Sequence, residues 1–162
     1  MNLKSLKQKL VGDLYKRGKV IFINKTNNNT REIINYNFSF NGVLRNIDEA
    51  YKEYYRRNIL PINLNPVVDL LKHDSTTRRA FITFWYNSQI YDDMPPCFCG
   101  VQILIRDKKL CLIISQRSMH LRFLEQDVSF FSLLSEEFCN KLKINTKNVI
   151  MTFNVGSIHE DI

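Results

Sequence analysis

The hydrophobic pattern of the first forty residues predicts a helix followed by two strands. Leucines recur at helical spacing over residues 2–17, and Gly18 is a residue type that ends helices. An apolar run at 19–24 and an alternating stretch at 32–40 are typical of strands. The polar segment 25–30 between them predicts a turn.

Three more helices are predicted further along the chain. Isoleucine, alanine and tyrosine side chains share one face of a helix at about 46–57. Pro61 and Pro66 bracket a loop, and Pro66 also suits the first turn of a short helix. Apolar residues at helical spacing predict a long helix from about 127 to 143.

The second half of the chain also carries predicted strands. An apolar stretch at 79–85 indicates a buried strand, and 100–106 with 110–118 predict a hairpin. Both hairpin strands are apolar on both faces, so we expect this part of the sheet to be covered on each side. A last strand is predicted at 148–155. This order of elements predicts one α+β domain over residues 1–162, with a mixed, mainly antiparallel sheet.

Length and composition agree with one folded domain, since 162 residues with 44% apolar content suffice for a core. No apolar run approaches the length of a membrane span, and the basic N-terminus lacks the features of a secretory signal. We therefore expect a cytoplasmic protein with reduced thiols. No histidine is spaced with a cysteine as a zinc site requires. The cysteines are Cys97, Cys99, Cys111 and Cys139.

The net charge of +7 permits binding of anions. Much of the excess lies in the first nineteen residues, where it predicts the solvated face of one helix. No tight basic block is interleaved with aromatic residues, which argues against nucleic acid as a partner, although a nucleic-acid-binding domain stays an alternative. The basic residues within the first nineteen positions are Lys4, Lys7, Lys9, Lys16, Arg17 and Lys19.

The segment Pro95-Pro96-Cys97 places a thiol on a stiff turn before one predicted strand, and Arg117 stands near the end of the next. A nucleophile beside an anion-binding arginine suits covalent chemistry on a phosphorylated substrate. A nearby cation is expected to lower the pKa of the thiol. A buried, inert cysteine is the alternative.

Taken together, several short motifs resemble the thymidylate synthase and pyrimidine hydroxymethylase family, in the family's order and at similar spacing over about residues 74–160. They are Ser75-Thr-Thr-Arg78-Arg79, Trp85-Tyr-Asn87, Pro95-Pro96-Cys97, Gln116-Arg117-Ser118, Asp127-Val-Ser-Phe-Phe-Ser-Leu-Leu134 and Gly156-Ser-Ile-His159.

The resemblance implies a thymidylate synthase-like fold and a pyrimidine nucleoside monophosphate as substrate. Cys97 would be the thiolate that adds to C6 of the pyrimidine, and Arg117 with Ser118 would bind the phosphate. Arg78 and Arg79 would reach the phosphate of the partner subunit in a homodimer with composite sites, whose interface a sheet face would form. An edge-strand salt bridge and a solvated basic pair are the respective alternatives.

The resemblance also implies roles for residues that recognise the rest of the nucleotide. Lys25 stands where the family has a phosphate-binding arginine; an ordinary hairpin loop is the alternative. Gln116 and His159 would contact the base and the sugar, unless His159 lies in a frayed terminus. Asp127 replaces the asparagine of thymidylate-forming members, which points to a cytosine base; a helix N-cap is the alternative.

The one-carbon donor implied by the resemblance is 5,10-methylenetetrahydrofolate, yet several folate-side features are absent. Phe98 and His120 replace a histidine and an aspartate of the family, and Asp161 replaces a tyrosine. A helical insertion before Asp74 and a closing C-terminal segment have no counterpart, and either Glu49 or Glu53 would stand for the catalytic glutamate. The rival hypothesis is therefore a non-catalytic nucleotide-binding relative or an assembly partner of a full-length enzyme.

Overall fold

A computed structural model of the protein describes residues 2–85 and 96–162. Pro95, Tyr86 and Asn87 of the predicted motifs lie outside the described residues. The helices are α1 (Leu3–Arg17), α2 (Glu49–Ile59), α3 (Asn65–His73) and α4 (Leu124–Leu142), with short 3-10 turns at Leu121–Phe123 and Thr146–Asn148. The strands are β1 (Lys19–Ile23), β2 (Asn28–Asn41), β3 (Phe81–Thr83), β4 (Phe98–Arg106), β5 (Lys109–His120) and β6 (Val149–Asp161).

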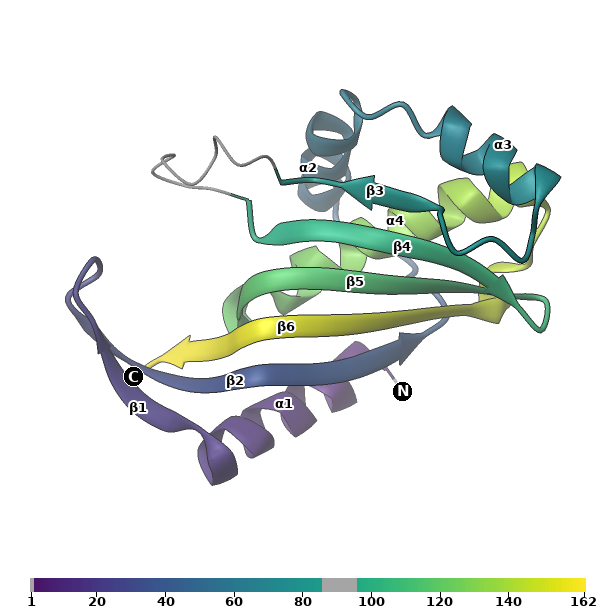
Figure 1. Cartoon of the computed structure of the whole chain (residues 1–162). Coiled ribbons are helices and arrows are strands. Elements are labelled where there is room, and N and C mark those ends of the chain that lie inside the picture. Colours follow the sequence, from purple (N-terminus) through teal and green to yellow (C-terminus); the bar gives the residue numbers. More distant parts are fainter. Residues whose placement is uncertain (1, 86–95) are drawn as a thin grey trace.

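The described strands form one sheet in the order β1-β2-β6-β5-β4-β3 (Figure 1). Neighbouring strands are antiparallel except β5 and β6, which run parallel. The crossover between β5 and β6 contains α4, as a parallel connection requires. Asp107 and Lys108 both have positive φ, which matches the tight hairpin turn between β4 and β5. The predicted mixed, mainly antiparallel α+β fold is confirmed.

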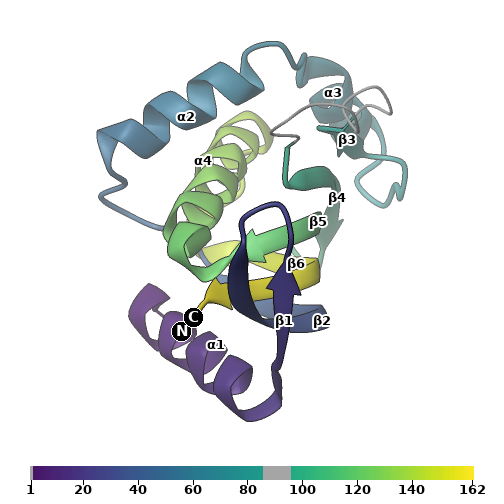
Figure 2. The same ribbon diagram turned by 90° about the vertical axis from the view of Figure 1, so that its left-hand side faces the viewer.

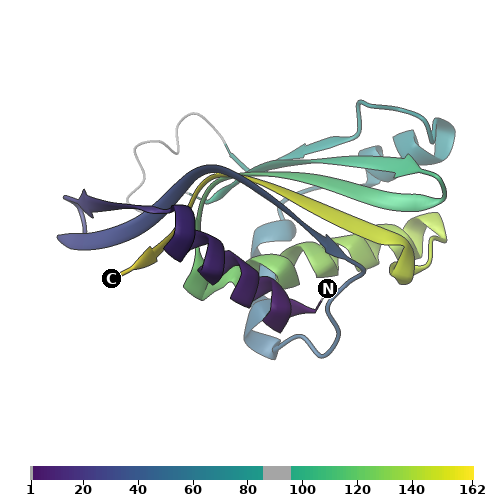
Figure 3. The ribbon, with the colours of Figure 1, turned by 90° about the horizontal axis from the view of Figure 1, so that it is seen from below.

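Helices α1, α2 and α4 lie on one side of the sheet (Figure 3). Helices α1 and α4 contact the strands, and α2 packs on α4 from outside (Figure 2). The core between sheet and helices contains the fully buried side chains Leu6, Leu10, Leu14, Ile103, Leu110, Leu112, Ile114, Phe130, Phe131, Phe138 and Phe153.

Within residues 2–85 and 96–162, no helix covers the opposite face of the sheet (Figure 3). The prediction that both faces of the β4–β5 hairpin are covered is therefore wrong for the described part of one subunit. Along β5, Leu112 and Ile114 are buried under α4, whereas Ile113 between them is only half-buried. In the same row across the sheet, Ile113 pairs with Gln102 of β4, and Gln102 pairs with Phe81 of β3. Phe81 is exposed over 53% of its surface. The sequence pattern is apolar on both faces because this second face is also partly apolar.

A bend crosses three adjacent strands at the row that joins Asn35, Gly156 and Arg117. Buried positions alternate along β2, β5 and β6 up to this row and are shifted by one residue beyond it. Asn35 has a φ of 55°, and a Cβ on Gly156 would lie 2.7 Å from the carbonyl oxygen of Arg117. Only glycine permits this approach. The curvature of β2 and β6 is visible in Figure 3.

Three predicted boundaries differ from the structure. The strand predicted at 79–85 is shorter, because only Phe81–Thr83 pairs with β4. The long helix begins at Leu124, three residues earlier than expected. Strand β6 continues to Asp161 because its last residues pair with both β2 and β5. None of the helices in the described part of the chain is long and apolar enough to cross a membrane.

Candidate active site

A cavity of about 870 Å³ opens between α2, the start of α4 and the ends of strands β4, β5 and β6. Its lining combines a thiol, a carboxyl group, two histidines and several aromatic rings. The side chains are those of Tyr54, Arg57, Asn58, Pro61, Ile62, Thr83, Phe84, Pro96, Cys97, Phe98, Ser118, Met119, His120, Phe123, Gln126, Asp127, Phe130 and His159.

Cys97 lies just before β4 and lines the cavity. Arg117 of the neighbouring strand donates its backbone N–H to the Cys97 carbonyl at 2.9 Å, and its Nη2 lies 3.9 Å from Sγ. The Arg117 Nε donates to the Pro96 carbonyl at 3.1 Å, and its guanidinium lies 5.6 Å from the centre of the Trp85 ring. The chain on either side of the thiol therefore fixes the cation beside it, as the sequence predicted.

The pKa of the Cys97 thiol is raised above its usual value, because burial is the largest influence on it. Arg117 lowers this pKa, while Asp127 and Cys99 raise it further. The expectation that a nearby cation lowers the pKa of the thiol is confirmed for Arg117, although the pKa is raised overall. The direction of the Arg117 effect is as expected, but desolvation exceeds it.

Gln116 and Asp127 form a buried pair, of which Asp127 lines the cavity. The Gln116 Nε2 donates to Asp127 Oδ2 at 2.7 Å and to the Ser118 carbonyl at 3.0 Å. Its Oε1 is buried without a hydrogen-bond partner. Burial raises the pKa of Asp127 to about 7, although the Gln116 hydrogen bond opposes this rise. A carboxyl group that changes protonation near neutrality is thus presented to the cavity.

The alternative that Asp127 caps a helix is excluded by the position of α4. The residue that precedes this helix is Phe123, and Asp127 lies within the first turns with its side chain turned inward. Asp127 is only 6% exposed, whereas a capping side chain bonds to the backbone at the helix end. The polar partner of the buried Asp127 carboxyl group is the Gln116 amide, and not the backbone at the helix end.

His159 lies on β6 opposite His120 of β5, so it does not belong to a frayed terminus. The two imidazole rings meet edge to face with their centres 5.1 Å apart. His120 Nδ1 accepts the backbone N–H of Arg122 at 3.0 Å, and its Nε2 lies 3.2 Å from Asp161 Oδ2. Burial, followed by the charge of His120, lowers the pKa of His159. Near neutral pH, His159 is therefore a neutral group.

Four of the nine predicted site residues line the cavity, namely Cys97, Ser118, Asp127 and His159. Gln116 and Arg117 do not line it but bond to Asp127 and lie beside Cys97, respectively, whereas Lys25, Arg78 and Arg79 also do not line it. Lys25 lies in the turn between β1 and β2, and the two arginines are exposed in the loop before β3. The arginine loop is held near β4, because the Arg78 carbonyl accepts from Gln102 Nε2 at 2.8 Å.

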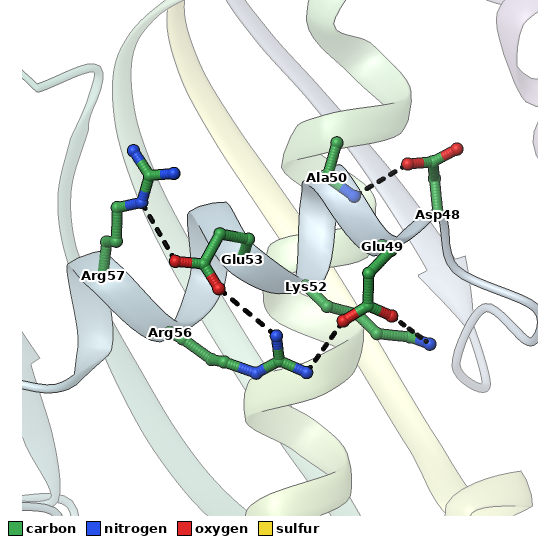
Figure 4. Close-up of polar contacts among 7 residues, drawn as sticks. All are labelled: Asp48, Glu49, Ala50, Lys52, Glu53, Arg56 and Arg57. Carbon is green, nitrogen blue, oxygen red and sulfur yellow. Dashed lines mark hydrogen bonds and ion pairs between the residues drawn. The ribbon is translucent and has the colours of Figure 1, made fainter.

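Neither glutamate of α2 reaches the cavity. Glu49 pairs with Lys52 at 3.2 Å and with Arg56 at 3.0 Å, and Glu53 pairs with Arg56 and Arg57 at 3.3 and 3.2 Å. Figure 4 shows this ladder of ion pairs along the outer side of the helix. The suggestion that Glu49 or Glu53 serves as the catalytic carboxylate is therefore wrong for this arrangement.

Sequence reasoning missed the contribution of α2 to the cavity wall. Tyr54, Arg57 and Asn58 all line the cavity, and their three- and four-residue spacing places them on one helical face. This spacing is visible in the sequence, but it does not distinguish a cavity wall from an ordinary helical surface. Burial raises the pKa of Tyr54, and the nearby Asp127 and Cys97 raise it further. Tyr54 is thus a neutral hydroxyl close to both groups.

Phe98, which follows the thiol, is buried in a cluster of aromatic rings. Its ring centre lies 5.0 Å from that of Phe130, 4.8 Å from Phe131 and 6.2 Å from Phe84. It stabilises the junction of β4 and α4 and carries no proton for acid–base chemistry. Within residues 2–85 and 96–162, no group of three His, Cys, Asp or Glu side chains could hold a metal ion.

A model of the thymidylate synthase family matches residues 45–161 of the chain. The match covers α2, α4 and strands β3 to β6, and therefore every element that lines the cavity. The resemblance inferred from the motifs is confirmed at the level of the family. Residues 1–44, which form α1, β1 and β2, lie outside the matched span.

Proposed function

Because the chain belongs to the thymidylate synthase family, we propose that it transfers a one-carbon unit to C5 of a pyrimidine nucleoside monophosphate. One observation carries the proposal: Cys97 Sγ lies 3.9 Å from the Arg117 guanidinium at the cavity that Asp127 lines. A nucleophile, an anion-binding cation and a base-contacting group thus lie within reach of one small ligand.

Cys97 acts as the nucleophile in this proposal. Its thiolate adds to C6 of the pyrimidine, and the electron pair of the C5=C6 bond becomes available at C5 for bond formation with the one-carbon unit. The C5 proton would leave as the bond between the one-carbon unit and its donor nitrogen breaks, with the electron pair going to that nitrogen. Addition of water to that carbon would give a hydroxymethyl group, or addition of a hydride from the donor a methyl group, and departure of the thiolate would restore the ring and free the enzyme. The neutral Tyr54 hydroxyl and neutral His159 are the cavity groups placed to exchange protons or hydrogen bonds with the substrate.

The phosphate is proposed to lie against Arg117 and Ser118. Arg117 offers a planar set of donors and Ser118 adds a hydroxyl, which suits phosphate oxygens. Arg78 and Arg79 do not line the cavity of their own chain, so we propose that they serve the cavity of a partner subunit. Lys25 is the remaining proposed phosphate ligand, from the turn between β1 and β2.

The uncovered sheet face supports the proposed homodimer. This face is formed by cross-strand neighbours on strands β2, β6, β5, β4 and β3. It is partly apolar, since it includes Ile113, Ile150, Leu104 and the exposed Phe81. A twofold axis through such a face buries the same surface on both subunits. The arginine loop borders this face, because Gln102 of the same face bonds to the Arg78 carbonyl.

Asp127 is proposed to select the base. When ionised it accepts from the N4 amino group of cytosine, and when protonated it donates to N3. The Gln116 amide donates to Oδ2, which leaves Oδ1 as the oxygen that carries the proton of the neutral form. Cytosine is therefore the proposed base, and CMP or dCMP the proposed substrate.

The proposed donor is 5,10-methylenetetrahydrofolate, which when bound supplies the carbon. Tyr54, Pro61, Ile62 and Phe123 give the cavity an apolar wall against which a flat ring would pack. Arg57 at this wall offers a cation for a carboxylate, although Glu53 shares it.

Tritium release from 5-tritiated dCMP, CMP and dUMP, each with methylenetetrahydrofolate, tests the proposal. We expect release from a cytosine nucleotide, its loss in Cys97→Ala, and its retention in Cys111→Ala, which removes a thiol from the sheet outside the cavity. Absence of release from all three nucleotides, or unchanged release from Cys97→Ala, would refute it.

A second candidate is a nucleotide-binding relative without catalysis. The outward orientation of Glu49 and Glu53 favours it, because no glutamate of α2 reaches the substrate cavity. Calorimetry separates the two functions. Binding of a nucleotide that neither promotes folate binding nor is promoted by it supports the second candidate, and mutual enhancement supports the enzyme.

A further inference from the structure

Nearly all the net positive charge of the chain lies in residues 1–44, outside the part that matches the family. This segment contains eight lysine and arginine residues and two acidic ones, so it carries six of the seven net charges. The matched part is almost neutral. The charge therefore belongs to the helix and hairpin formed by α1, β1 and β2, and not to the nucleotide cavity as a whole.

The fold brings exposed aromatic rings and a cation together on this segment. The Arg31 guanidinium lies 4.8 Å from the centre of the Tyr15 ring. The Arg31 side chain also passes close to Gly18, because a Cβ on that glycine would lie 2.9 Å from the Cγ of Arg31. Val20 is the cross-strand partner of Arg31, and Phe22 follows on the same face of β1. Tyr15, Val20 and Phe22 are 65%, 53% and 57% exposed. We call Tyr15, Val20, Phe22 and Arg31 the stacking face.

The stacking face is separate from the cavity. Strand residues alternate between the two faces of a sheet, so Arg31 points to the opposite side from its neighbour Glu32. Glu32 pairs in register with His159, which lines the cavity. Arg31 pairs in register with Glu160, which does not line it. None of the four residues of the stacking face lines the cavity.

We propose that the stacking face binds single-stranded nucleic acid. Bases stack on exposed aromatic rings without regard to sequence, while arginine and lysine neutralise the phosphates between them. Tyr15 and Phe22 provide two rings, Arg31 lies between the helix and the hairpin, and Lys16 is exposed beside Tyr15 at the end of α1. The sequence alone shows no compact basic and aromatic block, because Tyr15 and Arg31 meet only in the fold.

A membrane surface is the competing partner, and the hairpin argues against it. The tip between β1 and β2 reads Lys25-Thr-Asn-Asn-Asn, which offers amides and a charge where insertion into lipid needs apolar side chains. Glu160 beside Arg31 also disfavours contact with a continuous anionic layer. Bases and a discrete phosphate chain tolerate one carboxylate at the edge of the site.

Fluorescence anisotropy with a labelled twelve-residue oligouridylate tests the proposal on the full chain. We expect binding at 50 mM salt that weakens roughly sevenfold at 200 mM, if Lys16 and Arg31 each neutralise one phosphate. Tyr15→Ala and Phe22→Ala should each weaken binding on the order of tenfold. Both side chains are exposed, so circular dichroism should show that these variants remain folded.

A matched pair of charge reversals separates a defined surface from general attraction. Lys16→Glu with Arg31→Glu should abolish binding, whereas Lys108→Glu with Lys109→Glu, at the exposed β4–β5 turn, changes the net charge equally and should leave most binding intact. Equal loss in both double variants, no effect of Tyr15→Ala and Phe22→Ala, or binding only to phosphatidylserine vesicles would overturn the proposal. None of these outcomes depends on tritium release or on the cavity.

Discussion

Replacing Asp127 with asparagine should stabilise the protein at neutral pH while impairing the selection of its base. The pKa of Asp127 rises from 3.8 to about 7 because the folded chain removes the carboxyl group from water. A tenfold change in the proton dissociation constant corresponds to about 1.4 kcal/mol, so the ionised carboxylate lowers the free energy of unfolding by about 4 kcal/mol.

The sign follows from which state holds the proton. Below pH 3.8 Asp127 is protonated in both the folded and the unfolded chain, so it contributes no pH dependence. Between about pH 4 and pH 7 the folded chain keeps a proton that the unfolded chain has lost, and stability falls as pH rises. Above pH 7 the loss is complete. Asparagine cannot ionise, so the advantage of Asp127→Asn should grow over this range.

Urea denaturation of the wild type and Asp127→Asn at pH 4.5, 6 and 8 measures the effect. We expect the difference in unfolding free energy to grow toward about 4 kcal/mol at pH 8. His159, whose lowered pKa gives the opposite slope, cancels in the difference because both proteins contain it. Asp69→Asn is the matched control, since that aspartate is exposed on α3. A difference independent of pH would refute the assignment of the raised pKa to Asp127.

Two further predictions concern the thiol and the sheet. Alkylation of Cys97 by iodoacetamide should titrate above the usual thiol pKa, and Arg117→Gln should move it higher still, since Arg117 lowers the pKa; a lower apparent pKa in the variant would contradict this reasoning. Gly100→Ala should destabilise the protein by about 1–3 kcal/mol in urea denaturation, because the new Cβ would lie 2.8 Å from the Ile82 carbonyl oxygen of β3. Gly12→Ala, with open space around it, is the control, and equal costs would argue against the close packing of β3 on β4.

The periodic elements of the fold were predictable, and the bend in the sheet was not. Leucine spacing located α1 to within a residue, because only a helix buries Leu6, Leu10 and Leu14 on one face. The shift of buried positions at Asn35, Arg117 and Gly156 depends on how three strands meet in register. No local pattern encodes such a match, so β6 was predicted to end too early.

For the candidate site as well, the positions of several residues were predictable, whereas the protonation of Cys97 was not. Cys97, Ser118, Asp127 and His159 were recognised from motifs and converge on one cavity, since each motif lies at a strand end or helix start that the sheet brings together. The protonation of Cys97 was not predictable, because burial exceeds the effect of the adjacent cation. Burial is a property of the assembled fold, whereas the motif shows only which charges are near in sequence.

In the proposed dimer, the arginine pair of the partner subunit would affect the pKa of the Cys97 thiol. A dianionic phosphate placed against Arg117 neutralises the cation that lowers the pKa of Cys97, so nucleotide binding alone should make the thiolate harder to form. Two more cations, the partner's Arg78 and Arg79 in the proposed arrangement, would compensate for that charge. Replacing both arginines with alanine should therefore slow alkylation of Cys97 in the presence of dCMP and leave the rate without nucleotide unchanged. Equal rates in the presence of saturating dCMP would show that the arginine pair does not act on the thiol, and the composite site would lose its main physical justification.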